Sequence, residues 1–168
     1  MEGLRGDVVM DAMIYTYVKT PIGALLVARN EVGLTAIEFE KNGKRRMPHD
    51  GWTRDDGGFD DAREQLQAYF AGKRRTFDLP LAPKGTPFQL DVWNALQAIP
   101  YGQTRSYSQI ASTIGRPDAV RAVGAANGAN KIPIIIPCHR AIGANGSLTG
   151  FGGGMGTKRF LLDLELYV

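Results

Sequence analysis

The chain changes its pattern near residue 85, and this change limits the folds that it can adopt. The segments AMIYTYVKTPIGALLVA and GLTAIEFE, both in the first half, place β-branched and aromatic residues in partly alternating positions around a Pro-containing turn. That pattern is typical of antiparallel strands. After residue 85, apolar residues recur at helical spacing. Strands followed by helices predict an α+β fold with an N-terminal α/β domain over residues 1–84 and a mostly helical C-terminal domain over residues 85–168.

One helix is expected in the first half. Asp60 is the predicted N-cap, the apolar positions 62, 66, 69 and 70 share one face, and Gly72 ends the helix. The preceding stretch 41–58 is polar and rich in turn residues, so it is predicted to be a loop. TFDLPLAPKG, which follows the helix, is expected to form a short strand and a linker.

Several helices are expected in the second half. Thr86 caps the first one, Pro87 occupies its first position, and Pro100 stops it. Ser106 and Gln109 fit the S-x-x-Q capping box of a helix that ends at Gly115.

A short connection at Arg116-Pro117 leads to a further helix over residues 118–129. Two short helices joined by a few residues around a glycine predict a helix-turn-helix. The last helix is expected over residues 157–165.

The chain has one cysteine and two histidines among 168 residues. It cannot form an internal disulfide or a closed zinc site of the usual ligands, so no structural metal is expected. The N-terminal MEGLRGDVVMDAM lacks the apolar region of a signal peptide, and no stretch is long enough to span a membrane. These features predict a cytoplasmic protein.

The excess positive charge is confined to the second half. Residues 1–84 carry 13 Lys or Arg and 13 Asp or Glu, whereas residues 85–168 carry 7 and 4. This distribution fits an anionic partner, although three charges are weak evidence for nucleic acid.

The helix predicted at 118–129 consists mainly of small residues and has a single long cationic side chain, Arg121. Each interior glycine destabilises a helix by about 1 kcal/mol relative to alanine, so a compensating contact is expected. Either the helix packs tightly on a neighbour, or it approaches a nucleic-acid groove while Arg121 fills a space in the duplex. The spacing of the small residues in this helix fits both arrangements.

The only cysteine lies in IPIIIPCHRAI, residues 132–142. A single buried cysteine is more often a small apolar core residue than a nucleophile. Pro137 allows the chain to turn, which would let His139 take the proton of Cys138. Asp163 and Glu165 are both candidates to hold the other nitrogen of His139. The following loop GSLTGFGGG could be a connector or could donate backbone N–H groups to a ligand, and Tyr107 could be a core residue or a proton donor.

Together these segments resemble the O6-alkylguanine-DNA alkyltransferases, also called methylated-DNA–protein-cysteine methyltransferases. IPCHRAI closely resembles the active-site signature of that family. YGQTRSYSQIA, RAVGAANGAN, GSLTGFGGG and TKRFLLDLE match its helix-turn-helix, active-site loop and last helix in order. The match covers nearly all of residues 86–165 and is weaker in the N-terminal half.

The resemblance implies a ribonuclease-H-like N-terminal domain and a winged helix-turn-helix-like C-terminal domain. It implies DNA repair by direct reversal, in which an alkyl group passes once from O6-alkylguanine, or from O4-alkylthymine, to Cys138. His139 would act as base through a water and Glu165 would orient it. Asn130 would brace the turn, and Tyr107 would protonate N3 of the leaving guanine.

The other implied roles fall into two groups. Arg121, on a DNA-binding helix, would replace a base that is flipped out through the minor groove. The DNA-binding residues would be Arg121, Ala122, Gly124 and Ala125.

The substrate pocket would be formed by Pro133, Ala141, Phe151, Gly152 and Lys158. In it, the Gly152 N–H would donate to O6, the carbonyls of Cys138 and Ala141 would bind the exocyclic amine, and Lys158 would support the loop. The implied partner is double-stranded DNA, with no cofactor, no membrane and no obligate protein partner, so a monomer is expected.

This chain departs from the family in two loop positions. Phe151 stands where many members have Tyr, and Gly152 replaces a Ser or Ala of some members. The alternative functions are a cysteine hydrolase and a non-enzymatic module that recognises alkylated bases. His49, the only other histidine, lies in a polar loop, which disfavours the hydrolase, and the presence of Cys138 disfavours the module.

Overall fold

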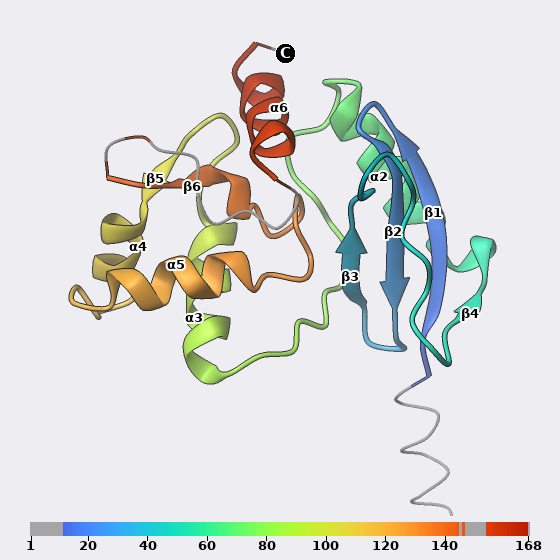
Figure 1. Ribbon diagram of the computed structural model, residues 1–168, viewed down its shortest axis with the longest axis horizontal. Helices are drawn as coiled ribbons and strands as arrows, with labels where there is room; N and C mark the ends of the chain where they lie inside the picture. Colours follow the sequence, from blue (N-terminus) through green and yellow to red (C-terminus); the bar gives the residue numbers. More distant parts are fainter. Residues whose placement is uncertain (1–11, 145, 147–153, 168) are drawn as a thin grey trace, which may run out of the picture. The chain divides into compact units, whose positions relative to one another are not determined.

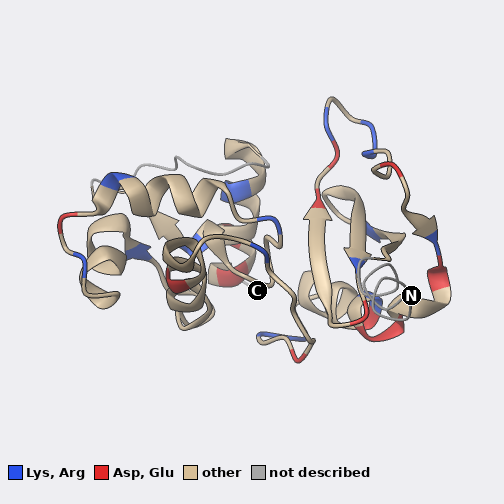
Figure 2. Ribbon diagram, turned by 90° about the horizontal axis from the view of Figure 1, so that it is seen from below, with Lys and Arg blue, Asp and Glu red and all other residues tan. Residues whose placement is uncertain are grey.

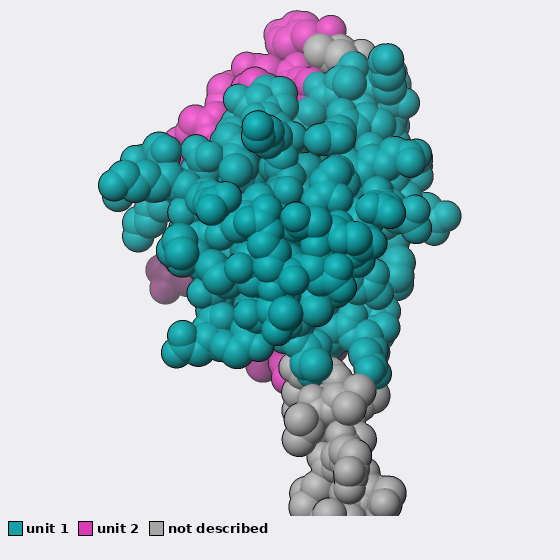
Figure 3. Space-filling model, turned by 90° about the vertical axis from the view of Figure 1, so that its right-hand side faces the viewer, with its two compact units in different colours: residues 1–83 teal, residues 84–168 magenta. Residues whose placement is uncertain are grey.

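The computed structural model describes residues 12–144, 146 and 154–167. The chain divides into two compact units, Met1–Pro83 and Lys84–Val168, which Figures 1 and 3 distinguish by sequence colour and by unit. The α+β fold class predicted from the sequence is confirmed, because strands dominate the first unit and helices the second.

The first unit is built on a four-stranded sheet. Strands β1 (Ile14–Thr20), β2 (Gly23–Arg29) and β3 (Leu34–Glu38) form the expected antiparallel meander. The turn between β1 and β2 needs Gly23, whose φ of 107° lies in the region that favours glycine. The fourth strand, β4 (Thr53–Arg54), pairs parallel to β1 inside the stretch predicted to be a loop. Two residues are too few to produce an alternating pattern.

Helix α2 (Asp60–Phe70) packs on the sheet beside β1 (Figure 1). Its buried residues are the predicted ones: Ala62, Leu66, Tyr69 and Phe70. The predicted N-cap is wrong. Asp60 is the first helical residue, because the 3₁₀ turn η1 (Asp56–Phe59) runs directly into α2 and leaves Phe59 at the cap position.

The strand predicted in TFDLPLAPKG is also wrong, since the segment pairs with β3 only through an isolated bridge between Leu34 and Leu81. The Leu34 N–H donates to the Pro80 carbonyl (2.9 Å) and the Ala82 N–H donates to the Leu34 carbonyl (2.8 Å). Prolines at positions 80 and 83 lack the N–H donors that a longer ladder would need.

The second unit contains α3 (Pro87–Gln97), α4 (Tyr107–Thr113), α5 (Val120–Gly128) and α6 (Met155–Tyr167). The predicted capping box of Ser106 with Gln109 is present, and Thr86, predicted as an N-cap, also forms a capping box, with Gln89. Helices α4 and α5 pack against each other, as a helix-turn-helix requires, and both also contact α3. The Trp93 indole N–H of α3 donates to the Ala126 carbonyl of α5 over 2.8 Å and fixes this packing.

A small parallel sheet links distant parts of the second unit. Strand β5 (Arg105–Ser106) precedes α4, and it pairs with β6 (Ala141–Ile142), which follows the Cys-His-Arg turn. The sheet therefore fixes the start of α4 beside the segment that carries Cys138. No helix in the described part of the chain has the length and apolar composition needed to cross a bilayer.

The Thr86 cap gives a first prediction. Replacing Thr86 with Ala should lower the free energy of unfolding by about 1 kcal/mol, because the side-chain oxygen that accepts the Gln89 N–H (3.1 Å) is lost. Thr86→Ser keeps that oxygen and should unfold close to the wild type. Urea denaturation monitored by circular dichroism measures both, and equal losses would show that the cap does not stabilise α3.

Candidate active site

The apolar run before Cys138 forms turns instead of an extended segment. Ile134 has a φ of 74°, and the Ile136 N–H donates back to the Ile132 carbonyl over 2.9 Å. A left-handed conformation at a β-branched residue costs about 1–2 kcal/mol. Ile132, Ile134 and Ile136 are almost completely buried, and their burial offsets this strain.

The backbone then turns sharply at Pro137. This residue has φ −80° and ψ 68°, and the Cys138 N–H donates to the Ile136 carbonyl over 2.7 Å, which is an inverse γ-turn. The 3₁₀ turn η2 (Cys138–Arg140) follows at once. Cys138 and His139 therefore do not point to opposite faces as they would on a strand.

His139 is held by a carboxylate from α6. Its Nε2 lies 2.6 Å from Oε2 of Glu165, and both side chains are buried. Asp163, the other acidic candidate, is half-exposed and lies 3.9 Å from Arg159 instead. The structure thus brings together His139 and Glu165 and leaves Asp163 at the surface.

Arg140 completes this cluster, and the sequence reasoning missed it. Its Nε and Nη2 donate to the two oxygens of Glu165, each over 2.9 Å, and its Nη1 donates to the Ile99 carbonyl over 2.7 Å. The Gly102 N–H also donates to Glu165 Oε1, over 3.1 Å. The sequence did contain a signal for this role. Arg140 directly follows the Cys138-His139 pair, and a buried arginine needs a carboxylate partner.

The charges of the cluster fix which nitrogen of His139 can accept a proton. Burial raises the pKa of Glu165, but hydrogen bonds from His139 and Arg140 outweigh it and hold that pKa well below its usual range. Burial lowers the pKa of His139, so its ring is neutral at neutral pH. Facing the ionised Glu165, Nε2 carries the hydrogen, and Nδ1 is left as the acceptor. Nδ1 is buried and has no hydrogen-bond partner among the described residues.

Cys138 rests as a thiol. Burial raises the pKa of Cys138 to about 11, opposed by a hydrogen bond from Asn130 and by the charge of Lys158. The side chain is almost completely buried. A nearby proton acceptor is therefore needed before the sulfur can act as a nucleophile.

Two asparagines hold the turn around Cys138. Asn130 donates to the Ile136 carbonyl (2.8 Å) and accepts from the Ile132 N–H (2.9 Å), so its side chain connects the two ends of this turn. Asn127 was not singled out from the sequence, yet its Nδ2 donates to the Cys138 carbonyl over 3.3 Å. It sits on the buried side of α5 and ties that helix to the cysteine.

Lys158 is buried on α6 and donates to the Ala141 carbonyl over 2.6 Å. Burial lowers the pKa of Lys158. The Cys138 carbonyl accepts from both the Ala141 N–H and Asn127. Since a carbonyl has two lone pairs, the Ala141 oxygen is the better candidate of the two to bind a further donor.

The exposed residues of α5 are mostly small, apart from Val120 and Arg121. Arg121, Ala122 and Ala125 are exposed, while Val123 and Ala126 face the core. A Cβ added at Gly124 would meet its nearest neighbour, Cδ2 of Tyr107, at an ordinary distance of 4.0 Å. Packing on α4 therefore does not require a glycine here, which favours the second explanation of this helix, close approach to a nucleic-acid groove.

Pro133 is buried in the turns before Cys138. Phe151 and Gly152 lie outside the described residues. His49 belongs to the first unit, where it stacks on Trp52 and lies 2.8 Å from Glu38. No group of His, Cys, Asp and Glu side chains in the described part of the chain is arranged to hold a metal ion.

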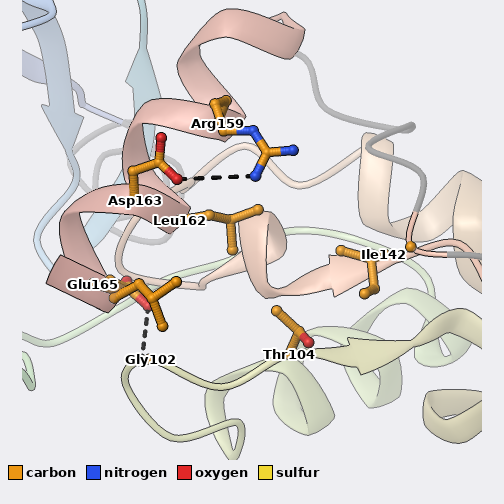
Figure 4. A pocket seen from close by; sticks show the side chains of 9 residues that line it. Gly102, Thr104, Ile142, Arg159, Leu162, Asp163 and Glu165 are labelled. Atoms are coloured by element: carbon orange, nitrogen blue, oxygen red, sulfur yellow. Dashed lines mark hydrogen bonds and ion pairs between the residues drawn. The ribbon is translucent and has the colours of Figure 1, made fainter.

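A pocket of about 210 Å³ lies beside Glu165, between α6, β6 and the turn before β5 (Figure 4). Its walls include the apolar side chains of Ile142 and Leu162 and the rim pair Arg159 and Asp163. Cys138 is not among the described residues that line it, so this pocket is not the site of the thiol.

Comparisons with known proteins cover both units. A family model described as "6-O-methylguanine DNA methyltransferase, DNA binding domain" matches residues 87–167, and one described as its "ribonuclease-like domain" matches residues 13–83. A methylated-DNA–protein-cysteine methyltransferase of Methanosarcina acetivorans is 52% identical over 91% of this chain and 98% of its own length. The constitutive one of Bacillus subtilis is 46% identical over 90% and 94%. Among solved structures, Mycobacterium tuberculosis OGT in complex with DNA is 50% identical, with a TM-score of 0.85 over 91% of this chain and 92% of that one.

The Arg140–Glu165 pair gives a second prediction. Arg140→Gln should lower the free energy of unfolding at neutral pH by about 3 kcal/mol, because it leaves a buried carboxylate short of its partner. The depressed pKa of Glu165 means that its stabilisation is complete above the ordinary glutamate pKa, about 4.3, and is lost as the pH falls toward the folded value. The free energy of unfolding of Arg140→Gln should therefore fall less between pH 7 and pH 3 than that of the wild type.

Urea denaturation across this pH range measures the effect. Arg159→Gln is the matched control, since it breaks the exposed pair with Asp163 and should change stability by less than about 1 kcal/mol. If both variants lost similar amounts of unfolding free energy, the buried Arg140–Glu165 pair would not stabilise the protein more than an exposed ion pair does.

Proposed function

The chain belongs to the methylated-DNA–protein-cysteine methyltransferase family, and from this we propose that Cys138 is the residue that takes the alkyl group. The protein is a DNA-repair enzyme that transfers a methyl group from DNA to a cysteine. The sequence offers one cysteine. The observation that supports this assignment most strongly is the cluster beside it, in which Glu165 fixes His139 with a buried proton acceptor at Nδ1.

The proposed reaction is an in-line displacement. The proton of the Cys138 thiol passes through a water to Nδ1 of His139, and the sulfur attacks the methyl carbon of O6-methylguanine. A sulfur–carbon bond forms while the carbon–oxygen bond breaks, and the electron pair of that bond stays on the base. The imidazolium formed at His139 lies 2.6 Å from the ionised Glu165, which stabilises it. The thioether product has no simple return to the thiol, so each molecule reacts once.

The leaving guanine must be protonated as the bond breaks. We assign this step to the hydroxyl of Tyr107, which would protonate N3 of the base. Tyr107 is the first residue of α4 and its ring lies next to Gly124 on α5, so the hydroxyl is carried by the helix pair that would meet DNA. The amide N–H of Gly152 is proposed to donate to O6 in the same step.

The exposed face of α5 is proposed to enter the minor groove. Ala122, Gly124 and Ala125 would allow a close approach, while Arg121 would fill the space of a flipped base. The buried position of Cys138 supports base flipping, because a stacked base could not bring its alkyl group to the sulfur. O4-alkylthymine, which presents an alkyl oxygen on a smaller ring, is proposed as a second substrate.

The remaining assignments follow from these. Residues 85–168 are proposed as the DNA-binding and acceptor domain and residues 1–84 as a supporting domain, with Pro133, Ala141, Phe151 and Lys158 around the substrate. The protein is inferred to act as a monomer in the cytoplasm, associated with the nucleoid when bound to DNA.

Incubation with duplex DNA that contains O6-methylguanine tests the acceptor. Intact mass should show the gain of a single methyl group, and peptide mapping should place it on Cys138. Cys138→Ser should stay unmodified while still binding the duplex, and undamaged duplex should give no gain. Binding without modification of the wild type, or repeated turnover, would overturn the proposal.

Arg121 tests the route to the base. Arg121→Ala should slow methyl transfer from duplex DNA by about tenfold or more, since a flipped base would no longer be replaced in the stack. The reaction with free O6-benzylguanine, which needs no flipping, should keep its rate. Arg159→Ala, which removes an exposed arginine of the same unit, serves as the matched control. Equal losses on duplex and free base would refute the role of Arg121.

A further inference from the structure

A cluster of cations lies at a tight turn in the first unit, far in sequence from the helix-turn-helix. Residues 41–46 read KNGKRR and are called the basic turn here. Asn42 and Gly43 have φ angles of 57° and 75°, the left-handed pair of a two-residue hairpin turn. The backbones of Lys41 and Lys44 bond each other in both directions, over 2.8 and 3.1 Å. Two lysines are thus held directly opposite each other, an arrangement that destabilises a hairpin by repulsion unless an anion lies nearby.

The carboxylates near the basic turn are already engaged. Glu38 contacts His49 at 2.8 Å and Arg46 at 3.7 Å. Glu40 accepts the Ala24 N–H over 2.7 Å. Among the described residues, no carboxylate pairs with Lys41, Lys44 or Arg45, so these three charges face solvent uncompensated. Figure 2 shows Lys and Arg on the loop that follows β3.

Arg45 is also held in place. Its guanidinium lies 4.2 Å from the centroid of the Tyr17 ring, and the Tyr17 hydroxyl donates to the Arg46 carbonyl over 2.6 Å. Contact with a ring face uses none of the guanidinium N–H donors, which remain in the fork geometry that suits a phosphate. A cation whose position is already restricted loses less entropy when it binds.

We propose that the basic turn binds phosphates of duplex DNA, so that the first unit contributes a contact of its own to the DNA. Duplex DNA is the polyanion on which this protein acts, and it carries about one charge per 1.7 Å of axis. In the second unit, Arg140 and Lys158 are not available for such contacts, because both are buried and bonded within the candidate active site. The inference rests on DNA binding by the proposed function, but not on the roles given to Cys138 or Arg121.

The salt dependence of binding to undamaged duplex tests this surface. The triple variant K41Q/K44Q/R45Q should shallow the slope of log affinity against log salt by about 2 to 3, as expected for three lost phosphate contacts. K73Q/R74Q/R75Q removes the same charge from the segment after α2 of the same unit and should leave the slope near that of the wild type. Both variants should react with free O6-benzylguanine at the wild-type rate.

The free-base reaction separates failure of this inference from failure of the proposed function. Equal slopes for the two triple variants would refute a contact by the basic turn. A loss of binding to heparin without a change on DNA would also overturn it, since the surface would then serve another polyanion. Thermal unfolding of both variants checks that the fold is kept. A wild type that does not react with the free base would instead refute the assignment of the acceptor, whatever the slopes.

Discussion

The buried carboxylate of Glu165 is the interaction on which the candidate site depends. It receives one hydrogen bond from His139, two from Arg140 and one from the Gly102 backbone, so it connects α6, the Cys-His-Arg turn and the segment before β5. Such a group is favourable only when every lone pair is used. The same bonds that satisfy the charge also orient His139. Stability and chemistry therefore cannot be changed independently at this position.

The sequence was most informative where local rules act alone. Thr86 and Ser106 begin helices at the predicted residues because a capping box involves only neighbouring groups. The buried face of α2 followed from the spacing of its apolar residues. The family resemblance rested on the motif around Cys138, on RAVGAANGAN and on TKRFLLDLE, and it supplied the predicted roles of His139, Asn130 and Glu165. In the structure His139 lies 2.6 Å from Glu165, and Asn130 donates to the Ile136 carbonyl.

The parts that sequence reasoning missed depend on contacts between distant residues. Ile134 adopts a left-handed φ although its β-branched side chain favours strands, because burial in the second unit outweighs the local preference. The two-residue strands β5 and β6 exist only as partners of each other. Arg140 was passed over because its role requires Glu165, 25 residues further along the chain, to accept from two side chains at once.

The burial of Cys138 has two opposite effects that together suit a single-use reagent. It raises the pKa of the thiol to about 11, so the resting sulfur is a poor nucleophile toward electrophiles that reach the protein by chance. Burial also places His139, Lys158 and Glu165 in surroundings of low dielectric, which strengthens each charge interaction that can stabilise the thiolate during reaction. In the proposed mechanism, reactivity is gained only when a substrate enters and the proton moves to His139. A protein that is consumed by its own reaction gains more from this selectivity than from a permanently activated thiolate.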